Sequence, residues 1–124
     1  MDAIISPEAM AGYKQSARLR EEQQRAGARK RRELAWSVAH VAADLLKRQF
    51  GAGRVILYGS VAHGHWFGPR SDIDLAEDGI NPTDFWRAWS ALDPIAQGFE
   101  INLIPLDTAI ESLRQVIEQE GVEL

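Results

Sequence analysis

The stretch from Val55 to Ala76 decides the fold of this chain and reads Val-Ile-Leu-Tyr-Gly-Ser-Val-Ala-His-Gly-His-Trp-Phe-Gly-Pro-Arg-Ser-Asp-Ile-Asp-Leu-Ala. It opens with an apolar run, residues 55–58, whose β-branched and aromatic side chains indicate a buried strand. Gly59 and Ser60 then end the strand abruptly. A glycine lets the backbone approach a ligand closely, and the free N–H groups of a following helix start suit a phosphate. The sequence therefore predicts a strand, a tight turn and a short helix start.

A second apolar stretch carries two carboxylates, Asp72 and Asp74. Side chains alternate between the faces of a strand, so both acids point the same way while Ile73 and Leu75 point into the core. Two neighbouring carboxylates repel each other and are costly to desolvate. A divalent cation relieves both effects, and Mg²⁺ in company with nucleotide phosphates is typically held by one or two carboxylates. The pair therefore predicts a magnesium site on this strand.

The combination of Gly59-Ser60 with Asp72-x-Asp74 resembles the signature of the polymerase-β-like nucleotidyltransferases. Within that superfamily it is similar to the small, single-domain minimal nucleotidyltransferases of prokaryotes. The resemblance is firm over residues 54–76 and traceable to the C-terminus. It implies an α+β fold, in which helices pack on a small mixed sheet of three or slightly more strands behind a long N-terminal helix.

The resemblance also implies that the chain binds ATP or another nucleoside triphosphate around the turn. The residues that it assigns to nucleotide binding are Gly59, Ser60, His63, Arg70 and Ser71. Many relatives have an arginine where this chain has His63. The positive charge at that position is therefore conditional on pH here.

The third acid of the family departs from the usual pattern. The predicted third strand spans residues 98–106, with Glu100 and Asn102 on one face, and the usual carboxylate falls on Asn102. An asparagine offers a carbonyl oxygen to a metal but neither a base nor a negative charge. We predict that Glu100 takes this part, so that Asp72, Asp74 and Glu100 are the catalytic residues and the ligands of two Mg²⁺ ions. The alternative is a site that binds nucleotide weakly and catalyses nothing.

The resemblance implies a reaction in which a nucleoside monophosphate, AMP from ATP, passes to a hydroxyl of an acceptor. Small relatives resemble the antitoxin partners of HEPN-domain ribonuclease toxins, in which the transferase adenylylates a tyrosine of the toxin. A HEPN-type protein is therefore the expected acceptor and partner. The alternative function is a catalytically weak or inactive binding module that acts by contact with a partner protein.

The chain as a whole has room for one small domain, because it has 124 residues. Helix-favouring residues run from Pro7 to Phe50, and we divide the chain into a polar, basic helical arm, residues 1–32, and a single domain, residues 33–124. Apolar spacing predicts further helices after Asn81 and after Asp107, the latter residue as cap, with Ile110, Leu113, Val116 and Ile117 facing the core.

Charge is distributed unevenly along the chain. Through residue 54 there are 11 Lys and Arg against 6 Asp and Glu, and from residue 55 onward there are 3 against 12. The arm ends in a basic cluster, residues 25–32, which raises the alternative of nucleic-acid binding, although the acidic remainder disfavours it. Solvated helix faces explain the same pattern.

The cellular setting follows from what the sequence lacks. It has no cysteine, no apolar run of membrane-spanning length and no signal-peptide pattern at its N-terminus. We therefore expect a cytoplasmic protein without membrane contact. A homo-oligomer is compatible with the sequence, which does not fix the oligomeric state.

Overall fold

The computed structural model describes residues 6–64, 67–68 and 70–124. Its first element is α1, one continuous helix from Pro7 to Phe50 that Gly27 does not interrupt. The Ser6 hydroxyl caps it by accepting a hydrogen bond from the Ala9 backbone N–H at 3.1 Å. Gly51 ends it in the left-handed conformation, with φ of 76°, which glycine adopts without steric penalty.

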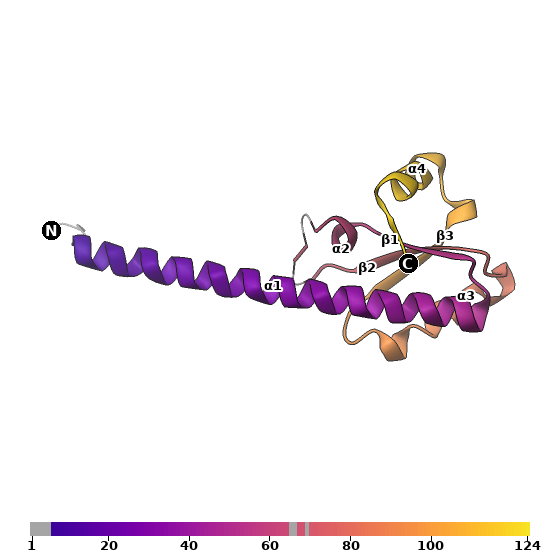
Figure 1. Ribbon diagram of the computed structural model, residues 1–124, viewed down its shortest axis with the longest axis horizontal. Coiled ribbons are helices and arrows are strands. Elements are labelled where there is room, and N and C mark those ends of the chain that lie inside the picture. Colours follow the sequence, from indigo (N-terminus) through magenta and orange to yellow (C-terminus); the bar gives the residue numbers. More distant parts are fainter. Residues whose placement is uncertain (1–5, 65–66, 69) are drawn as a thin grey trace.

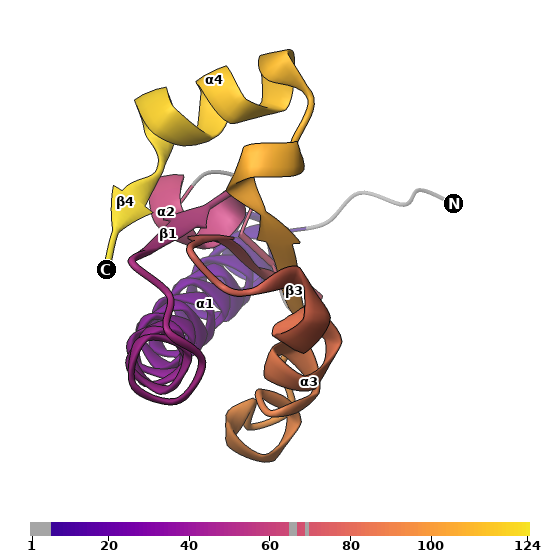
Figure 2. The ribbon, with the colours of Figure 1, turned by 90° about the vertical axis from the view of Figure 1, so that its right-hand side faces the viewer.

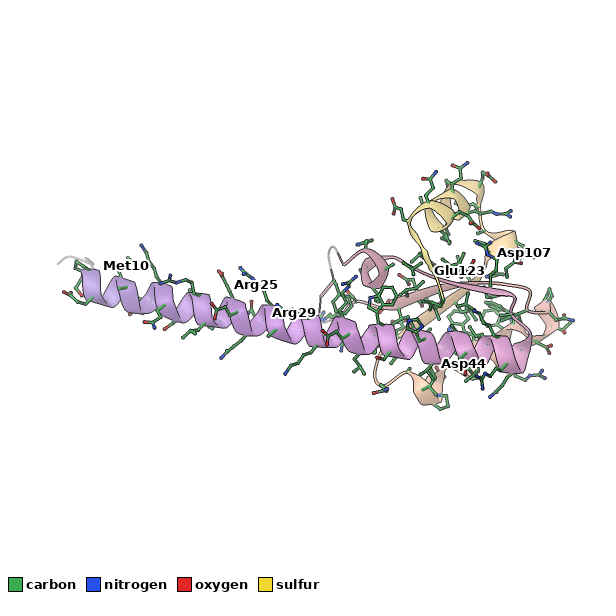
Figure 3. The ribbon with its side chains drawn as sticks, in the orientation of Figure 1. Met10, Arg25, Arg29, Asp44, Asp107 and Glu123 are labelled. Carbon is green, nitrogen blue, oxygen red and sulfur yellow. The ribbon has the colours of Figure 1, made fainter. Side chains whose placement is uncertain are left out.

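The two halves of α1 have different surroundings. The first half extends well beyond the rest of the molecule (Figure 1), and its side chains, among them Met10 and Arg25, are exposed (Figure 3). The buried residues of α1 all lie in the second half, from Ala35 to Leu46. A polar helix has little to pack against in its own domain, which explains why this half projects. The division of the chain after residue 32 stays a prediction.

A four-stranded sheet forms the centre of the domain. Its strands are β1 (Arg54–Tyr58), β2 (Ile73–Asp78), β3 (Ile101–Pro105) and β4 (Val122–Glu123), in the spatial order β3-β2-β1-β4. β1 pairs antiparallel with β2 and β4, whereas β2 and β3 are parallel. The predicted α+β fold with a small mixed sheet is confirmed, and the C-terminal tail supplies its fourth strand.

The helices lie on both faces of this sheet. α1 and α3 (Phe85–Ser90) cover one face, α4 (Glu111–Glu120) lies over the other, and α2 (Ser60–His63) follows β1 (Figure 2). Short 3₁₀ turns at Pro82–Asp84, Asp93–Ile95 and Leu106–Thr108 complete the chain. Among the described residues, no helix is both long enough and apolar enough to cross a membrane.

The last helix differs from its prediction. Asp107 lies in a 3₁₀ turn, and α4 begins four residues later without a side-chain cap, so the predicted cap is wrong. Ile110 and Val116 are 70% and 45% exposed, and only Ile117 of the predicted apolar stripe is fully buried. Because only Ile117 of this stripe is buried, α4 covers its face of the sheet only thinly.

Two apolar clusters occupy the two faces of the sheet. The larger one joins alternate strand residues, such as Leu57, Leu75 and Leu103, to the buried side of α1. The smaller one joins Ile56 and Ala76 to Leu106 and Ile117 under α4, with Tyr58 and Ile104 at its margin. Because side chains alternate along a strand, polar residues that are two positions from a member of the smaller cluster on the same strand lie on the same, thinly covered face.

Candidate functional site

Three polar side chains form a row across that thinly covered face. Tyr58 ends β1, and its register partner on β2 is Asp74, whose own partner on β3 is Asn102. Residues in register on neighbouring strands point to the same face, so the row is continuous over three strands. Asp74 and Asn102 are both half-buried. The sheet therefore positions a carboxylate between a phenol and an amide.

The Asn102 amide connects the two predicted metal-binding acids. Its Nδ2 donates to Asp72 Oδ2 at 3.2 Å and to Asp74 Oδ1 at 3.3 Å. Asp72, predicted to lie on the strand with Asp74, lies just before it. β2 begins at Ile73, because only from Ile73 onward does the chain pair with its neighbours. The two carboxylates therefore lie side by side with one neutral donor between them.

The electrostatics of the row reflect this crowding. Burial raises the pKa of the Asp74 carboxyl; the hydrogen bond from Asn102 opposes this rise, and the carboxylates of Asp72 and Glu100 add to it. Burial and the Asp74 charge also raise the pKa of the Tyr58 hydroxyl to about 12. Negative charge is thus concentrated at a half-buried place, where a cation would relieve it.

The Gly59 turn lies directly against the Asp74 carboxylate. Gly59 has φ of 76°, and a Cβ added there would lie 2.6 Å from Asp74 Oδ2, far inside van der Waals contact. Both the backbone conformation and the available space therefore require glycine. The predicted turn and the predicted acids meet at one point of the fold.

The residues after Gly59 form the short helix α2. The His63 N–H donates to the Gly59 carbonyl at 3.2 Å, and the Gly64 N–H donates to the Ser60 carbonyl at 2.8 Å. Val61 is fully buried, which fixes this helix to the core. Ser60 therefore begins a turn of helix beside the carboxylates, and His63 ends it with an exposed side chain.

The loop before Asp72 carries the other two predicted nucleotide-binding residues. The Gly68 N–H donates to Ser71 Oγ at 2.8 Å, and the Ser71 N–H donates back to the Gly68 carbonyl at 3.1 Å. This exchange closes the loop just before the acids. Arg70, in the same loop, is exposed. Residues 65, 66 and 69 lie outside the described part of the chain.

Glu100 lies near the acids but does not contact them as Asn102 does. β3 begins at Ile101, so Glu100 precedes the strand that was predicted to include it. Its backbone carbonyl accepts a hydrogen bond from the Ile73 N–H at 2.9 Å, and its side chain is exposed. Within the described ranges, no three His, Asp or Glu side chains converge as one cation site. The assignment of Glu100 as third acid stays a prediction.

With this geometry in view, the chain was compared with known proteins. No protein-family model and no curated protein matches the sequence. Solved structures do match. One, classed as a minimal nucleotidyltransferase, is 27% identical with a TM-score of 0.50, and the alignment covers 77% of this chain and 91% of that one. The chain has the fold of the minimal nucleotidyltransferases. The resemblance predicted from the sequence is confirmed.

Two further matches come from toxin–antitoxin structures. One is of the MntA–HepT pair, with 20% identity, a TM-score of 0.53 and coverage of 71% of this chain and 69% of that one. The other is of a toxin–antitoxin with AMP-PNP, with 24% identity, a TM-score of 0.55 and coverage of 64% and 66%. At these identities the two matches establish the shared fold alone.

The chemistry of this site fits a divalent cation. Asp72 and Asp74 are side by side and half-buried, and the Asn102 amide, after rotation about its terminal bond, offers a carbonyl oxygen to the same place. Mg²⁺ takes this kind of sparse oxygen ligation when phosphates complete its shell. The donor set present is thus two carboxylates and one amide, with Glu100 nearby.

Sequence reasoning missed two residues of the site. Tyr58 counted only as the end of an apolar run, although its position directly before Gly59 was a signal that it adjoins the turn. Arg32 counted as part of the basic arm, yet its guanidinium contacts α2. No sequence signal separates it from the exposed arginines around it.

A hollow of about 180 Å³ lies elsewhere, at the other end of β2. It is lined by Glu77, Phe85, Trp86 and Asp107, among others. Glu77 is only 3% exposed and accepts a hydrogen bond from the Ile80 N–H at 3.0 Å, and its pKa is raised mainly by burial. This hollow is separate from the carboxylate pair, which lies on the opposite face of the sheet.

Proposed function

We propose that the protein is a Mg²⁺-dependent nucleotidyltransferase that moves AMP from ATP to a hydroxyl of a partner protein. One observation carries the proposal: the Gly59 turn lies within 2.6 Å, measured from an ideal Cβ, of the Asp74 carboxylate, which Asn102 joins to Asp72. A turn that only glycine can form, directly beside paired carboxylates, suits a phosphate chain bound next to a cation. The fold shared with minimal nucleotidyltransferases supports the same conclusion.

In the proposed complex the turn binds the β- and γ-phosphates. Backbone N–H groups of Gly59 and Ser60 and the Ser60 hydroxyl donate to phosphate oxygens. His63 and Arg70 are exposed and are the side chains proposed to contact further phosphate oxygens, and Ser71 keeps the loop before the acids closed. A toxin–antitoxin of the same fold was solved with AMP-PNP, which supports a nucleotide as ligand.

Asp72 and Asp74 would hold Mg²⁺, with the carbonyl oxygen of Asn102 turned toward it. The bound ion supplies charge neutralisation for the triphosphate and for the departing pyrophosphate. Glu100 is the proposed third acid, at the place where a second ion would be held. Its exposed position allows it to accept the proton of the incoming hydroxyl.

The proposed reaction is a single displacement at the α-phosphorus. The acceptor oxygen forms a bond to the α-phosphorus, the bond from that phosphorus to the bridging oxygen breaks, and pyrophosphate leaves. The proton of the acceptor passes to Glu100. The chain's own task is to keep both oxygens aligned with the phosphorus, which the Gly59 turn and the carboxylate pair would do.

A protein of the HEPN type is the proposed acceptor. The solved relatives include an MntA–HepT toxin–antitoxin, and the projecting half of α1 offers an exposed helical surface to a partner. A second function has an observation of its own in its favour. The Asn102 amide gives each of the two acids a hydrogen-bond donor without any cation, which suits a binding module without catalysis.

Transfer of label from α-³²P-ATP in the presence of Mg²⁺ tests the proposal. The acceptor is a co-purified partner or cell lysate, and the variants are Asp72→Asn, Asp74→Asn and Glu100→Gln. We expect a labelled protein band that is lost in all three variants. Label that survives Glu100→Gln removes that residue from the mechanism. Partner binding without label under any condition supports the binding module instead.

A further inference from the structure

One arginine of the basic cluster turns away from solvent and contacts the nucleotide-binding segment. Arg32 Nε donates to the Val61 carbonyl at 3.0 Å, and its Nη2 donates to the Ala62 carbonyl at 3.2 Å. Arg32 is half-buried, and a Cβ added at Gly64 would lie 3.0 Å from its Cζ. The guanidinium therefore fits closely against the last turn of α2.

These two hydrogen bonds act on carbonyls at the end of a short helix. α2 has four residues, and the last carbonyls of any helix lack partners within it. Two of those carbonyls accept hydrogen bonds from one guanidinium. Because its N–H groups lie in one rigid plane, the guanidinium restrains the direction as well as the length of both hydrogen bonds. Arg32 thereby links the end of α2 to α1.

The orientation of α2 reaches the carboxylates through the backbone. The His63 N–H is bonded to the Gly59 carbonyl, so Gly59 and the two carbonyls that Arg32 holds belong to one hydrogen-bonded unit. Gly59 in turn lies against Asp74, so closely that a Cβ added to it would lie 2.6 Å from Asp74 Oδ2. A rotation of α2 would therefore move the turn relative to the acids.

We propose that Arg32 is a positioning residue for the nucleotide: it holds the Gly59 turn in place from α1. This rests on the proposed function, because it assigns a role in nucleotide binding. Arg32 does not touch the reacting atoms. It makes the long N-terminal helix a structural part of the site, whereas the other cluster residue next to it, Arg31, lies over the Phe99 ring at 4.3 Å and contributes packing.

The test compares Arg32→Gln, Arg32→Lys and the control Arg29→Gln in the full-length chain. Arg29 is exposed on the same helix and carries the same charge, so its replacement reproduces the change in net charge alone. Hydrogen exchange of the backbone amides of residues 59–64 reports on the turn itself. The Kd of AMP-PNP and the KM and kcat with ATP report on the nucleotide. Mn²⁺ binding without nucleotide reports on the carboxylates.

We expect Arg32→Gln to speed exchange in residues 59–64 and to raise the Kd of AMP-PNP and the KM for ATP about tenfold, the effect of losing a charged hydrogen-bond pair. Mn²⁺ affinity and kcat at saturating ATP should change by less than about twofold on the same reasoning. Arg32→Lys should restore part of the affinity, because an ammonium still reaches one carbonyl. Arg29→Gln should match the wild type in every measurement.

The outcomes separate this inference from the proposed function. Unchanged exchange in Arg32→Gln overturns the inference, as does an equal loss of Mn²⁺ affinity, which would indicate general damage to the site. If the wild type binds no nucleotide but Arg32→Gln still speeds exchange at residues 59–64, Arg32 does hold the turn in place, and the proposed function fails. Normal exchange combined with a raised KM also contradicts positioning through α2.

Discussion

Replacing Asn102 by aspartate places a third carboxylate at the centre of the site and tests its electrostatics. In the wild type the Asn102 amide donates to both acids, so Asn102→Asp removes two hydrogen bonds and adds a negative charge beside two others. In the absence of divalent ions the variant should be less stable than the wild type. With Mg²⁺ present, the same three carboxylates should become a stronger cation site.

The size of the effect follows from the contacts. The donor–acceptor distances of 3.2 and 3.3 Å are long, so we assign about 1 kcal/mol to each hydrogen bond. Two like charges 4 Å apart cost about 4 kcal/mol at an effective dielectric of about 20. One of the carboxylates can instead take up a proton, which at pH 7 costs about 4 kcal/mol for a carboxyl of ordinary pKa. The repulsion therefore cannot destabilise the variant by more than this amount. Because the half-buried site retains some water, we expect a total loss of about 3–5 kcal/mol.

Thermal unfolding with EDTA and with saturating Mg²⁺ measures this loss. For a chain of this length it corresponds to a fall in Tm of roughly 10–20 °C in EDTA. Mg²⁺ should recover most of it, since a ligand that binds the folded state stabilises that state. The control Asn102→Leu loses both hydrogen bonds but adds no charge. It should lose about 2 kcal/mol and recover less with Mg²⁺.

Two results would refute this reasoning. One is an Asn102→Asp variant whose Tm in EDTA equals that of Asn102→Leu, because the acids would then not interact through space. The other is a loss that Mg²⁺ does not recover, because the three oxygens would then not converge on one ion.

Three further perturbations test separate parts of the structure. Gly59→Ala should abolish nucleotide binding and cost about 1–2 kcal/mol of stability, because its Cβ meets the Asp74 carboxylate at a φ that disfavours side chains; calorimetric titration with AMP-PNP and urea unfolding measure the two effects. Glu77→Gln should raise stability at pH 7 by on the order of 1 kcal/mol, because it keeps an acceptor for the Ile80 N–H and removes a buried charge. The pKa of Glu77 is raised in the folded state, so the wild type loses stability as pH rises from the unfolded pKa to the folded pKa. Below both pKa values Glu77 is protonated in both states, so the difference in stability between the two proteins should vanish near about pH 3 in thermal melts. Arg54→Gln should loosen α4 and β4, because Arg54 pairs with carboxylates on both, and faster hydrogen exchange in residues 111–124 would report it.

Each of these expectations has a clear contradiction. Nucleotide affinity retained in Gly59→Ala would mean that the turn does not carry the phosphates. A Glu77→Gln variant that is less stable at pH 7 would mean that the Glu77 charge is compensated in the folded protein. Unchanged exchange at the C-terminus of Arg54→Gln would mean that apolar contacts alone hold α4.

Much of the site was predictable because its parts are local. The apolar run ending at Gly59 and the alternation around Asp72 and Asp74 each depend on a few neighbouring residues, and both strands and the turn exist as predicted. Asp72, predicted to lie on the strand, lies one residue before β2, a difference within the usual uncertainty of an element's end.

The remainder depends on contacts between distant segments. That Asn102 lies opposite Asp74 follows from the register of two parallel strands joined by a long connection, which no local pattern specifies. The third strand was predicted to begin at residue 98, but β3 begins at Ile101, so Glu100 lies outside β3. Arg32 and Arg29 look equivalent in the sequence, and only the packing of α1 against α2 distinguishes them.

Intact-mass measurement of the partner protein, before and after incubation with the wild type, ATP and Mg²⁺, tests the central claim most directly. The proposed function predicts a mass increase of one nucleoside monophosphate on the partner, with release of pyrophosphate, and no increase with the Asp72→Asn/Asp74→Asn variant. A partner that binds tightly yet keeps its mass with every nucleoside triphosphate would contradict the claim and leave a binding module in its place.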